Sequence, residues 1–178
     1  MKRICSFLVA TAAMICGGVA SGAESEAVLP VTVCGLLSEP ASFNHKLINI
    51  SGTVARGFEE FTLSDASCDN RNTIWLEFGG RRSSEVVYCC GVSTAPMRRR
   101  SLTVEGIRTR LVQDKLFARF QQLSQGEIPY SKVKASIIGR YFSGTLQEMP
   151  GGTFWMGYGH FGMGSLLVIQ QVLAVEEM

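Results

Sequence analysis

The chain has 178 residues, of which 46% are hydrophobic, with 17 basic and 15 acidic side chains. This length is typical of a single domain whose hydrophobic core is large enough to be stable without metal ions or disulfides. The sequence contains no heptad pattern, tandem repeat or low-complexity block, which excludes coiled coils and repeat proteins.

The N-terminus has the pattern of a secretory signal peptide. Lys2 and Arg3 precede an apolar run over residues 4–15, and Ser21 and Ala23 fit the small-x-small rule for cleavage. Twelve apolar residues are too few to cross a hydrocarbon core of about 30 Å as a helix. We therefore expect residues 1–23 to be a leader and residues 24–178 to form one exported domain, periplasmic or secreted, with no transmembrane span after cleavage.

Two other interpretations of the leader remain open. One is a retained membrane anchor, and the other is a lipoprotein with lipid attached at Cys16. Ile15 argues against the second, because lipid attachment sites require a small residue at that position. Without the leader the chain has 15 basic and 15 acidic residues, so no overall charge attracts it to nucleic acid.

Four cysteines follow the leader, namely Cys34, Cys68, Cys89 and Cys90. An even number in an oxidising compartment favours disulfides, and four cysteines allow three pairings. We prefer Cys34–Cys68, which ties an N-terminal segment to the first hairpin and stabilises the fold by about 3–4 kcal/mol in the chain-entropy model. The other two pairings join Cys34 to Cys89 or Cys90.

Along the chain, residues 31–40 come first and favour a short helix that ends before Pro40. Residues 46–56 then alternate, with Ile48, Ile50 and Val54 on one face, as a half-buried strand does. Residues 58–64 and 73–78 alternate in the same way on either side of a loop-forming stretch. Together these segments predict a meander of three strands.

The middle of the chain, about 79–131, is less regular and is interpreted as an insertion. Residues 79–100 are expected to be mostly loop, and residues 101–107 a short strand. Over residues 110–125, Val112, Leu116, Phe120 and Leu123 recur at helical spacing. The pattern predicts an amphipathic helix with these four residues on its apolar face.

The last third of the sequence is again typical of strands. Residues 132–142 alternate until Ile138 and Gly139 break the pattern, which suggests a bulge in that strand. Residues 143–164 are rich in turn-forming residues, and residues 165–175 form a buried final strand. The predicted fold is mainly β with one or two helices.

The order of three strands, a helix and two strands is that of an OB-fold, a five-stranded Greek-key barrel. The segments FNHKLINISGTVARGFEEFTLSD and SLLVIQQVLAVE resemble the first hairpin and closing strand of OB-like domains in exported bacterial proteins of largely undefined function. This resemblance implies an OB-like barrel of five to six strands. The extra strand at 101–107 departs from the pattern, and an immunoglobulin-like sandwich is the main rival.

Basic residues are concentrated in the insertion. Residues 79–119 contain nine basic residues and only three acidic ones, Glu85, Glu105 and Asp114. Guanidinium groups suit phosphates and carboxylates, so an anionic envelope component or a partner protein is a candidate ligand, with a solvated loop surface as the alternative. The candidate contact residues are Arg98, Arg99, Arg100, Arg108 and Arg110.

A second candidate site lies in the turn-rich segment. Thioether and imidazole groups suit Cu(I) or Ag(I), and an aromatic ring adds cation–π attraction. The segment is loosely similar to periplasmic copper-binding OB-fold proteins, which implies Met156, His160, Met163 and Trp155 as ligands. The alternative is a glycine-rich hairpin whose methionines and aromatic residues cover the barrel.

No catalytic motif is present in the sequence. His45 and His160 are its only histidines, and neither belongs to a known motif. We therefore expect a non-enzymatic binding module without a cofactor. Cu(I) or Ag(I) binding is the first alternative, and an unrecognised hydrolase is the second.

Overall fold

The computed structural model describes residues 26–57, 60–68, 73–86, 96–125, 131–159, 162 and 164–178. The predicted leader, residues 1–23, lies outside these ranges. No helix in the described part of the chain has the length and apolar character needed to span a membrane.

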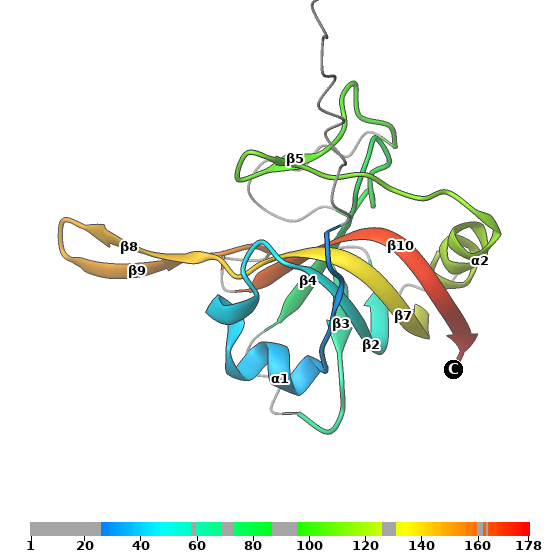
Figure 1. Cartoon of the computed structure of the whole chain (residues 1–178), viewed down its shortest axis with the longest axis horizontal. Coiled ribbons are helices and arrows are strands. Elements are labelled where there is room, and N and C mark those ends of the chain that lie inside the picture. The colour runs from blue at the N-terminus through cyan, green and yellow to red at the C-terminus, as the bar shows by residue number, and fades with distance from the viewer. Residues whose placement is uncertain are drawn as a thin grey trace, which may run out of the picture.

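Five strands form a barrel (Figure 1). They are β2 (Leu47–Arg56), β3 (Phe61–Ser64), β4 (Ile74–Phe78), β7 (Ser131–Phe142) and β10 (Ser165–Glu177). Their order in the sheet is β2-β3-β4-β10-β7, and β7 pairs with β2 to close the ring. Strands β4 and β10 run parallel, and the other pairs are antiparallel. The mainly β, OB-like barrel that the sequence predicts is therefore confirmed.

Alternating side chains build the core inside this ring. Ile48, Ile50 and Val54 of β2 are buried, as predicted, and Ile137 of β7 and Leu167 of β10 face them from the other strands of the barrel. Burying one such aliphatic side chain contributes about 1.5–3 kcal/mol. Hydrophobic burial within the barrel is thus the main source of stability.

Helix α2 (Lys115–Ser124) closes one end of the barrel (Figure 1). Asp114 caps it by accepting a hydrogen bond from the Phe117 N–H at 2.9 Å. Phe117 and Phe120 are buried, and both rings lie against Phe78 of β4, with centroids 5.2 and 6.4 Å away.

The predicted apolar face of this helix is partly wrong. Val112 precedes the helix and Leu116 lies on its outer side, and both are more than one-third exposed. The helix begins at Lys115, and Phe117 and Phe120, which pack on Phe78, form its buried face in place of Leu116. Phe120 is buried and Leu123 is partly buried, as predicted.

The predicted bulge in β7 is also corrected. Strand β7 pairs with β2 without interruption through Ile138 and Gly139, and the irregularities lie on β10, between Ile169 and Gln171 and between Val172 and Ala174. Glycine is needed at position 139 because a Cβ there would lie 2.8 Å from the Val168 carbonyl oxygen of β10. The first of these irregularities lies directly opposite Ile138 and Gly139, because Gln170 is the extra residue between their two partners. The bulge is thus at the predicted position but on the partner strand.

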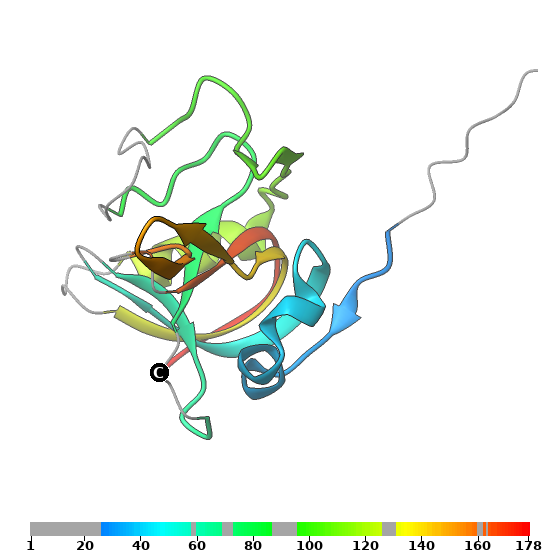
Figure 2. The same ribbon diagram turned by 90° about the vertical axis from the view of Figure 1, so that its left-hand side faces the viewer.

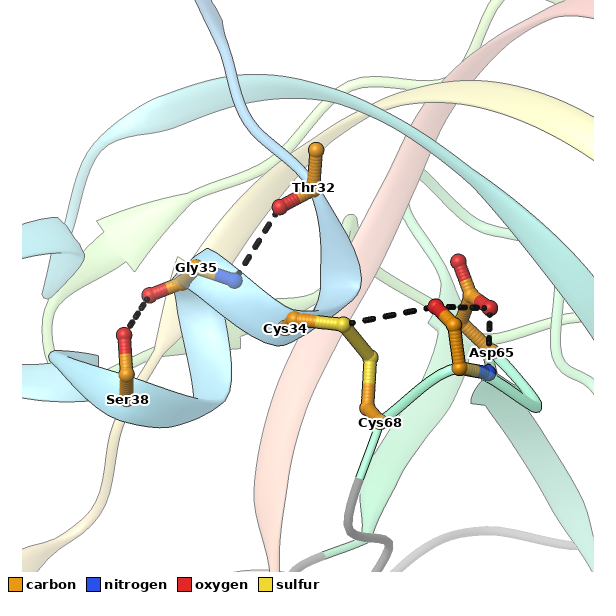
Figure 3. The surroundings of a disulfide bond; sticks show 7 residues. Thr32, Cys34, Gly35, Ser38, Asp65 and Cys68 are labelled. Atoms are coloured by element: carbon orange, nitrogen blue, oxygen red, sulfur yellow. Dashed lines mark hydrogen bonds between the residues drawn. A yellow bond between two sulfur atoms is a disulfide. The ribbon is translucent and has the colours of Figure 1, made fainter.

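Helix α1 (Val33–Ser38) and the 3₁₀ helix η1 (Pro40–Phe43) precede β2, and Val33 and Leu36 of α1 are fully buried in the hydrophobic core. The Thr32 hydroxyl caps α1 by accepting a hydrogen bond from the Gly35 N–H at 3.1 Å. A disulfide joins Cys34 of α1 to Cys68 of the β3–β4 loop, which confirms the preferred pairing (Figure 3). Cys89 and Cys90 lie outside the described residues.

Two short hairpins extend from the barrel (Figures 1 and 2). One is formed by β8 (Thr145–Met149) and β9 (Gly152–Met156), within the predicted turn-rich segment. The other consists of β5 (Thr103–Val104) and β6 (Ile107–Arg108), where the sequence suggests a single strand. Glu105 and Gly106 have φ values of 48° and 80°, so the chain turns at these two residues.

Candidate functional site

The basic residues of the insertion lie on adjacent backbone segments. We call residues 79–86 and 96–111 the insertion arm. The Arg98 N–H donates to the Arg81 carbonyl at 2.7 Å, and the Leu102 N–H donates to the Gly80 carbonyl at 2.7 Å. The β5–β6 hairpin then returns the chain so that the Thr109 N–H donates to the Leu102 carbonyl. Arginines that are up to 29 positions apart in sequence are thereby carried on one arm.

A buried ion pair fixes the base of the arm to β4. The Glu77 carboxylate is 2.9 Å from Arg98 Nη2, and their side chains are 2% and 11% exposed. The Ser84 N–H and hydroxyl each donate to this carboxylate at 2.8 Å. Arg98 Nη1 donates to the carbonyls of Phe78, at 3.0 Å, and of Arg82.

These contacts change the interpretation of Arg98. The sequence groups it with its neighbours as a ligand-binding residue, but its guanidinium is engaged by Glu77 and two backbone carbonyls. Arg98 therefore anchors the arm, and Arg99 and Arg100 beside it point into solvent.

A second arginine is buried next to this anchor. The Arg56 guanidinium lies over the rings of Phe61 and Phe78, 5.3 and 5.9 Å from their centroids, and donates to the Ser84 carbonyl. Burial lowers the pKa of Arg56, although the nearby Glu85 and Glu77 oppose this effect. Glu77 therefore acts on both buried guanidinium groups, and Glu85 shares the compensation of Arg56 with it.

Close backbone packing also holds the arm against the barrel. The Gly79 N–H donates to the Ile169 carbonyl of β10 at 2.9 Å. A Cβ at position 79 would lie only 2.2 Å from the Arg110 carbonyl oxygen. A glycine at this position is therefore required for the two ends of the arm to meet at the barrel wall.

A hydrogen-bonded cluster fixes the tip of the arm to the other end of the barrel. Glu105, at the β5–β6 turn, accepts a hydrogen bond from the Tyr158 hydroxyl at 2.5 Å, and its other oxygen lies 2.5 Å from His45 Nε2. The His45 and Tyr158 rings both lie against the buried Phe142, with centroids 5.6 and 6.3 Å away. We call His45, Glu105 and Tyr158 the latch.

The environment of the latch favours the ionised form of Glu105. Burial raises the pKa of Glu105, but the hydrogen bonds from Tyr158 and His45 and the charge on His45 outweigh it, so the net pKa lies below its ordinary value. Sequence analysis missed this cluster because its members are 53 and 60 positions apart. The Glu-Gly dipeptide at 105–106 is the one local signal, since it indicates a tight turn.

The remaining arginines of the predicted site are exposed. Arg99, Arg100, Arg108 and Arg110 are all solvent-accessible. Within the described ranges, Arg99, Arg100 and Arg108 form no ion pair with a carboxylate of the protein. Arg110 lies close enough to Glu26 for its charge to lower the pKa of that carboxyl. The arm thus presents positive charge that the described part of the protein leaves largely uncompensated.

The predicted metal ligands are only partly described. Met156, at the end of β9, is 50% exposed, and Trp155 precedes it in the same strand. His160 and Met163 lie outside the described residues. Among the residues that are described, no group of three or more His, Cys, Asp or Glu side chains could hold a metal ion.

An open groove of about 640 Å³ crosses the outer face of β2, β7 and β10. Most of its lining side chains are small, including Ser51, Thr53 and Ser136, and its charged residues are Asp65, Lys134 and Glu176. This mixture of charges differs from the insertion arm, in which arginines outnumber carboxylates. No protein-family model, curated protein or solved structure matches the chain. The chemistry of the arm therefore carries the functional inference.

Proposed function

We propose that this protein is an exported, non-enzymatic binding module that contacts an anionic ligand through the insertion arm. The observation that carries the proposal is the exposure of Arg99, Arg100 and Arg108, without a carboxylate partner among the described residues, on an arm held at both ends. Guanidinium groups bind phosphates and carboxylates through paired, charge-assisted hydrogen bonds.

The two attachments of the arm support a preorganised contact surface. The Glu77–Arg98 ion pair holds its base, and the latch holds its tip. A surface that is already ordered loses less conformational entropy when a ligand binds. The same arginines on a free loop would bind the same ligand more weakly.

Export is part of the same proposal. It is supported by the signal-peptide pattern over residues 1–23 and by the disulfide between Cys34 and Cys68, a bond that persists in oxidising compartments. The anion would then be an envelope component or a partner protein in the periplasm or outside the cell.

Salt-dependent retention on a sulfated or phosphorylated resin tests the proposal. We expect the triple variant Arg99→Ser, Arg100→Ser, Arg108→Ser to elute at clearly lower salt than the wild type, because each lost contact reduces the number of displaced counterions. The matched control removes three exposed positive charges elsewhere, namely Arg119, Lys132 and Lys134. Equal elution of the two triple variants would show that only net charge matters, and the proposal would fail.

Cu(I) or Ag(I) binding is the second proposal, and the exposure of Met156 on β9 supports it. A half-exposed thioether is accessible to a soft ion. Titration with Ag(I) should change the tryptophan fluorescence of the wild type and have a weaker effect on Met156→Ile. Fluorescence that stays constant in the wild type would exclude this alternative.

A further inference from the structure

The N-terminal segment Glu26–Val31 lies in an extended conformation along one edge of β2. Strand β1 (Leu29–Pro30) pairs in parallel with Ile48 and Asn49, and the Val31 N–H donates to the Asn49 carbonyl at 3.0 Å. Strand β3 covers the same edge only from Thr53 to Arg56. The first half of β2 therefore has an edge that β3 leaves uncovered, and the N-terminal segment occupies it.

Proline is tolerated at position 30 for a simple geometric reason. The Val31 N–H points toward β2, and the backbone N–H groups of successive residues in a strand point to opposite sides. The backbone nitrogen of residue 30 therefore faces away from β2. The missing N–H of Pro30 therefore costs no ladder bond, and it prevents a further strand from pairing on the outer side. The segment therefore adds one strand to the edge of β2 and blocks the pairing of another strand beyond it.

The Glu26 carboxylate makes a two-pronged contact with Arg140 of β7. Its Oε2 lies 2.5 Å from Arg140 Nη2, and its Oε1 accepts from Arg140 Nη1. This hydrogen bonding, aided by the charges of Arg140, Lys46 and Arg110, holds the pKa of Glu26 below its ordinary value although burial opposes it. The geometry is that of paired guanidinium–carboxylate recognition.

The two sides of this contact differ in how firmly they are held. The Arg140 side chain is 13% exposed, and it also donates to the His45 carbonyl at 2.8 Å, so the barrel positions it without Glu26. The Glu26 side chain is 49% exposed, and Val28 and Leu29 are 39% and 37% exposed. The receptor side is built into the barrel, while the segment on it buries little apolar surface.

We propose that Arg140 and the free edge of β2 over residues 47–50 form a docking site for an extended peptide that carries a carboxylate, and that residues 26–31 occupy it as an intramolecular competitor. Backbone pairing along the edge supplies affinity, and the guanidinium selects an acidic side chain. The inference goes beyond the proposed function, because this site does not use Arg99, Arg100 or Arg108.

A synthetic peptide tests the site on the full chain. The probe is an acetylated, fluorescent peptide with the sequence of residues 26–32, EAVLPVT, followed by anisotropy. The Glu26→Gln protein should bind it at least about tenfold more tightly than the wild type, because the competitor has lost its charge-assisted contact. The control Glu176→Gln, an exposed carboxyl on β10, should bind the probe as the wild type does.

Changing the acidic residue of the peptide gives a second test. The peptide QAVLPVT should bind the Glu26→Gln protein at least about tenfold more weakly than EAVLPVT. Arg140→Met should remove this difference between the two peptides. Equal affinity of the two peptides for the Glu26→Gln protein, or no binding of either, would overturn the proposal.

Discussion

The barrel and the insertion arm are held together by different forces. In the barrel, strands of up to 13 residues enclose a continuous hydrophobic core. The strands of the arm have two residues each, and its fixed points are the Glu77–Arg98 ion pair at its base and the latch at its tip. Apolar burial is thus the main stabilising contribution in the barrel. In the arm, charged hydrogen bonds act together with the packing of Val86, Leu102 and Ile107 against the core.

This difference separates stability from the proposed function. Arg99, Arg100 and Arg108 project from the arm and take no part in the core. Substituting them should therefore change binding and leave folding almost intact, whereas substitutions in the core should do the reverse. Each prediction below tests one side of this contrast.

The largest effect is expected in the barrel. Phe120→Ala should lower the free energy of unfolding by about 4 kcal/mol, because it removes a fully buried ring that lies against Phe61 and Phe78. Leu116→Ala, on the exposed side of α2, should cost less than about 1 kcal/mol. Denaturant midpoints measure both, and similar losses would contradict the assignment of the buried helix face.

A smaller loss is expected at the base of the arm. Glu77→Gln should lower the free energy of unfolding by about 3 kcal/mol, because Arg98 would remain buried without its ion-pair partner. Glu177→Gln, an exposed carboxyl on β10, is the matched control and should have little effect. Thermal unfolding compares the two variants. An unchanged stability of Glu77→Gln would show that the ion pair does not stabilise the protein.

The latch should contribute less, and in a pH-dependent way. Tyr158→Phe should cost about 1 kcal/mol at neutral pH. Because the pKa of Glu105 is lower in the folded state than in the unfolded state, its stabilisation is present above about pH 4.5 and is lost as the pH falls through the folded-state value. Glu105→Gln should therefore flatten the stability curve below pH 4.5. A curve as steep as that of the wild type would rule out this contribution.

The smallest effect on stability is expected for the exposed arginines. Each of Arg99→Ser, Arg100→Ser and Arg108→Ser should change the free energy of unfolding by no more than about 0.5 kcal/mol. Chemical denaturation measures this directly. A loss above 1 kcal/mol for any of them would show that the arm depends on that side chain for its structure.

The sequence predicts the barrel well because strand alternation records burial residue by residue. The positions of Ile48, Ile50 and Val54 are sufficient to place β2, and Pro40 limits the helix at 33–38. The apolar face of α2 is partly mispredicted because Leu116 and Phe117 are adjacent and both apolar, and packing against Phe78 of the distant strand β4 decides which of them is buried. The break at Ile138 and Gly139 likewise gives the position of the bulge but not the strand that carries the extra residue, because pairing with β10 is not visible in one strand alone.

The arm was less predictable because its anchors join distant parts of the chain. Arg98, Arg99 and Arg100 are chemically identical in the sequence, and only the position of Glu77 at the end of β4 distinguishes Arg98 from its neighbours. The contacts of Glu105 with His45 and Tyr158 likewise depend on the tertiary structure. Charge density located the arm but did not assign a role to each arginine.

Hydrogen exchange with a polyanionic probe tests the central claim, that the arm is the contact surface, most directly. Backbone amides of residues 99–110 should become more protected when the probe is added, and those around Lys132 and Lys134 on β7 should not change. Protection that is absent from the arm, or equal on the arm and on β7, would contradict the account.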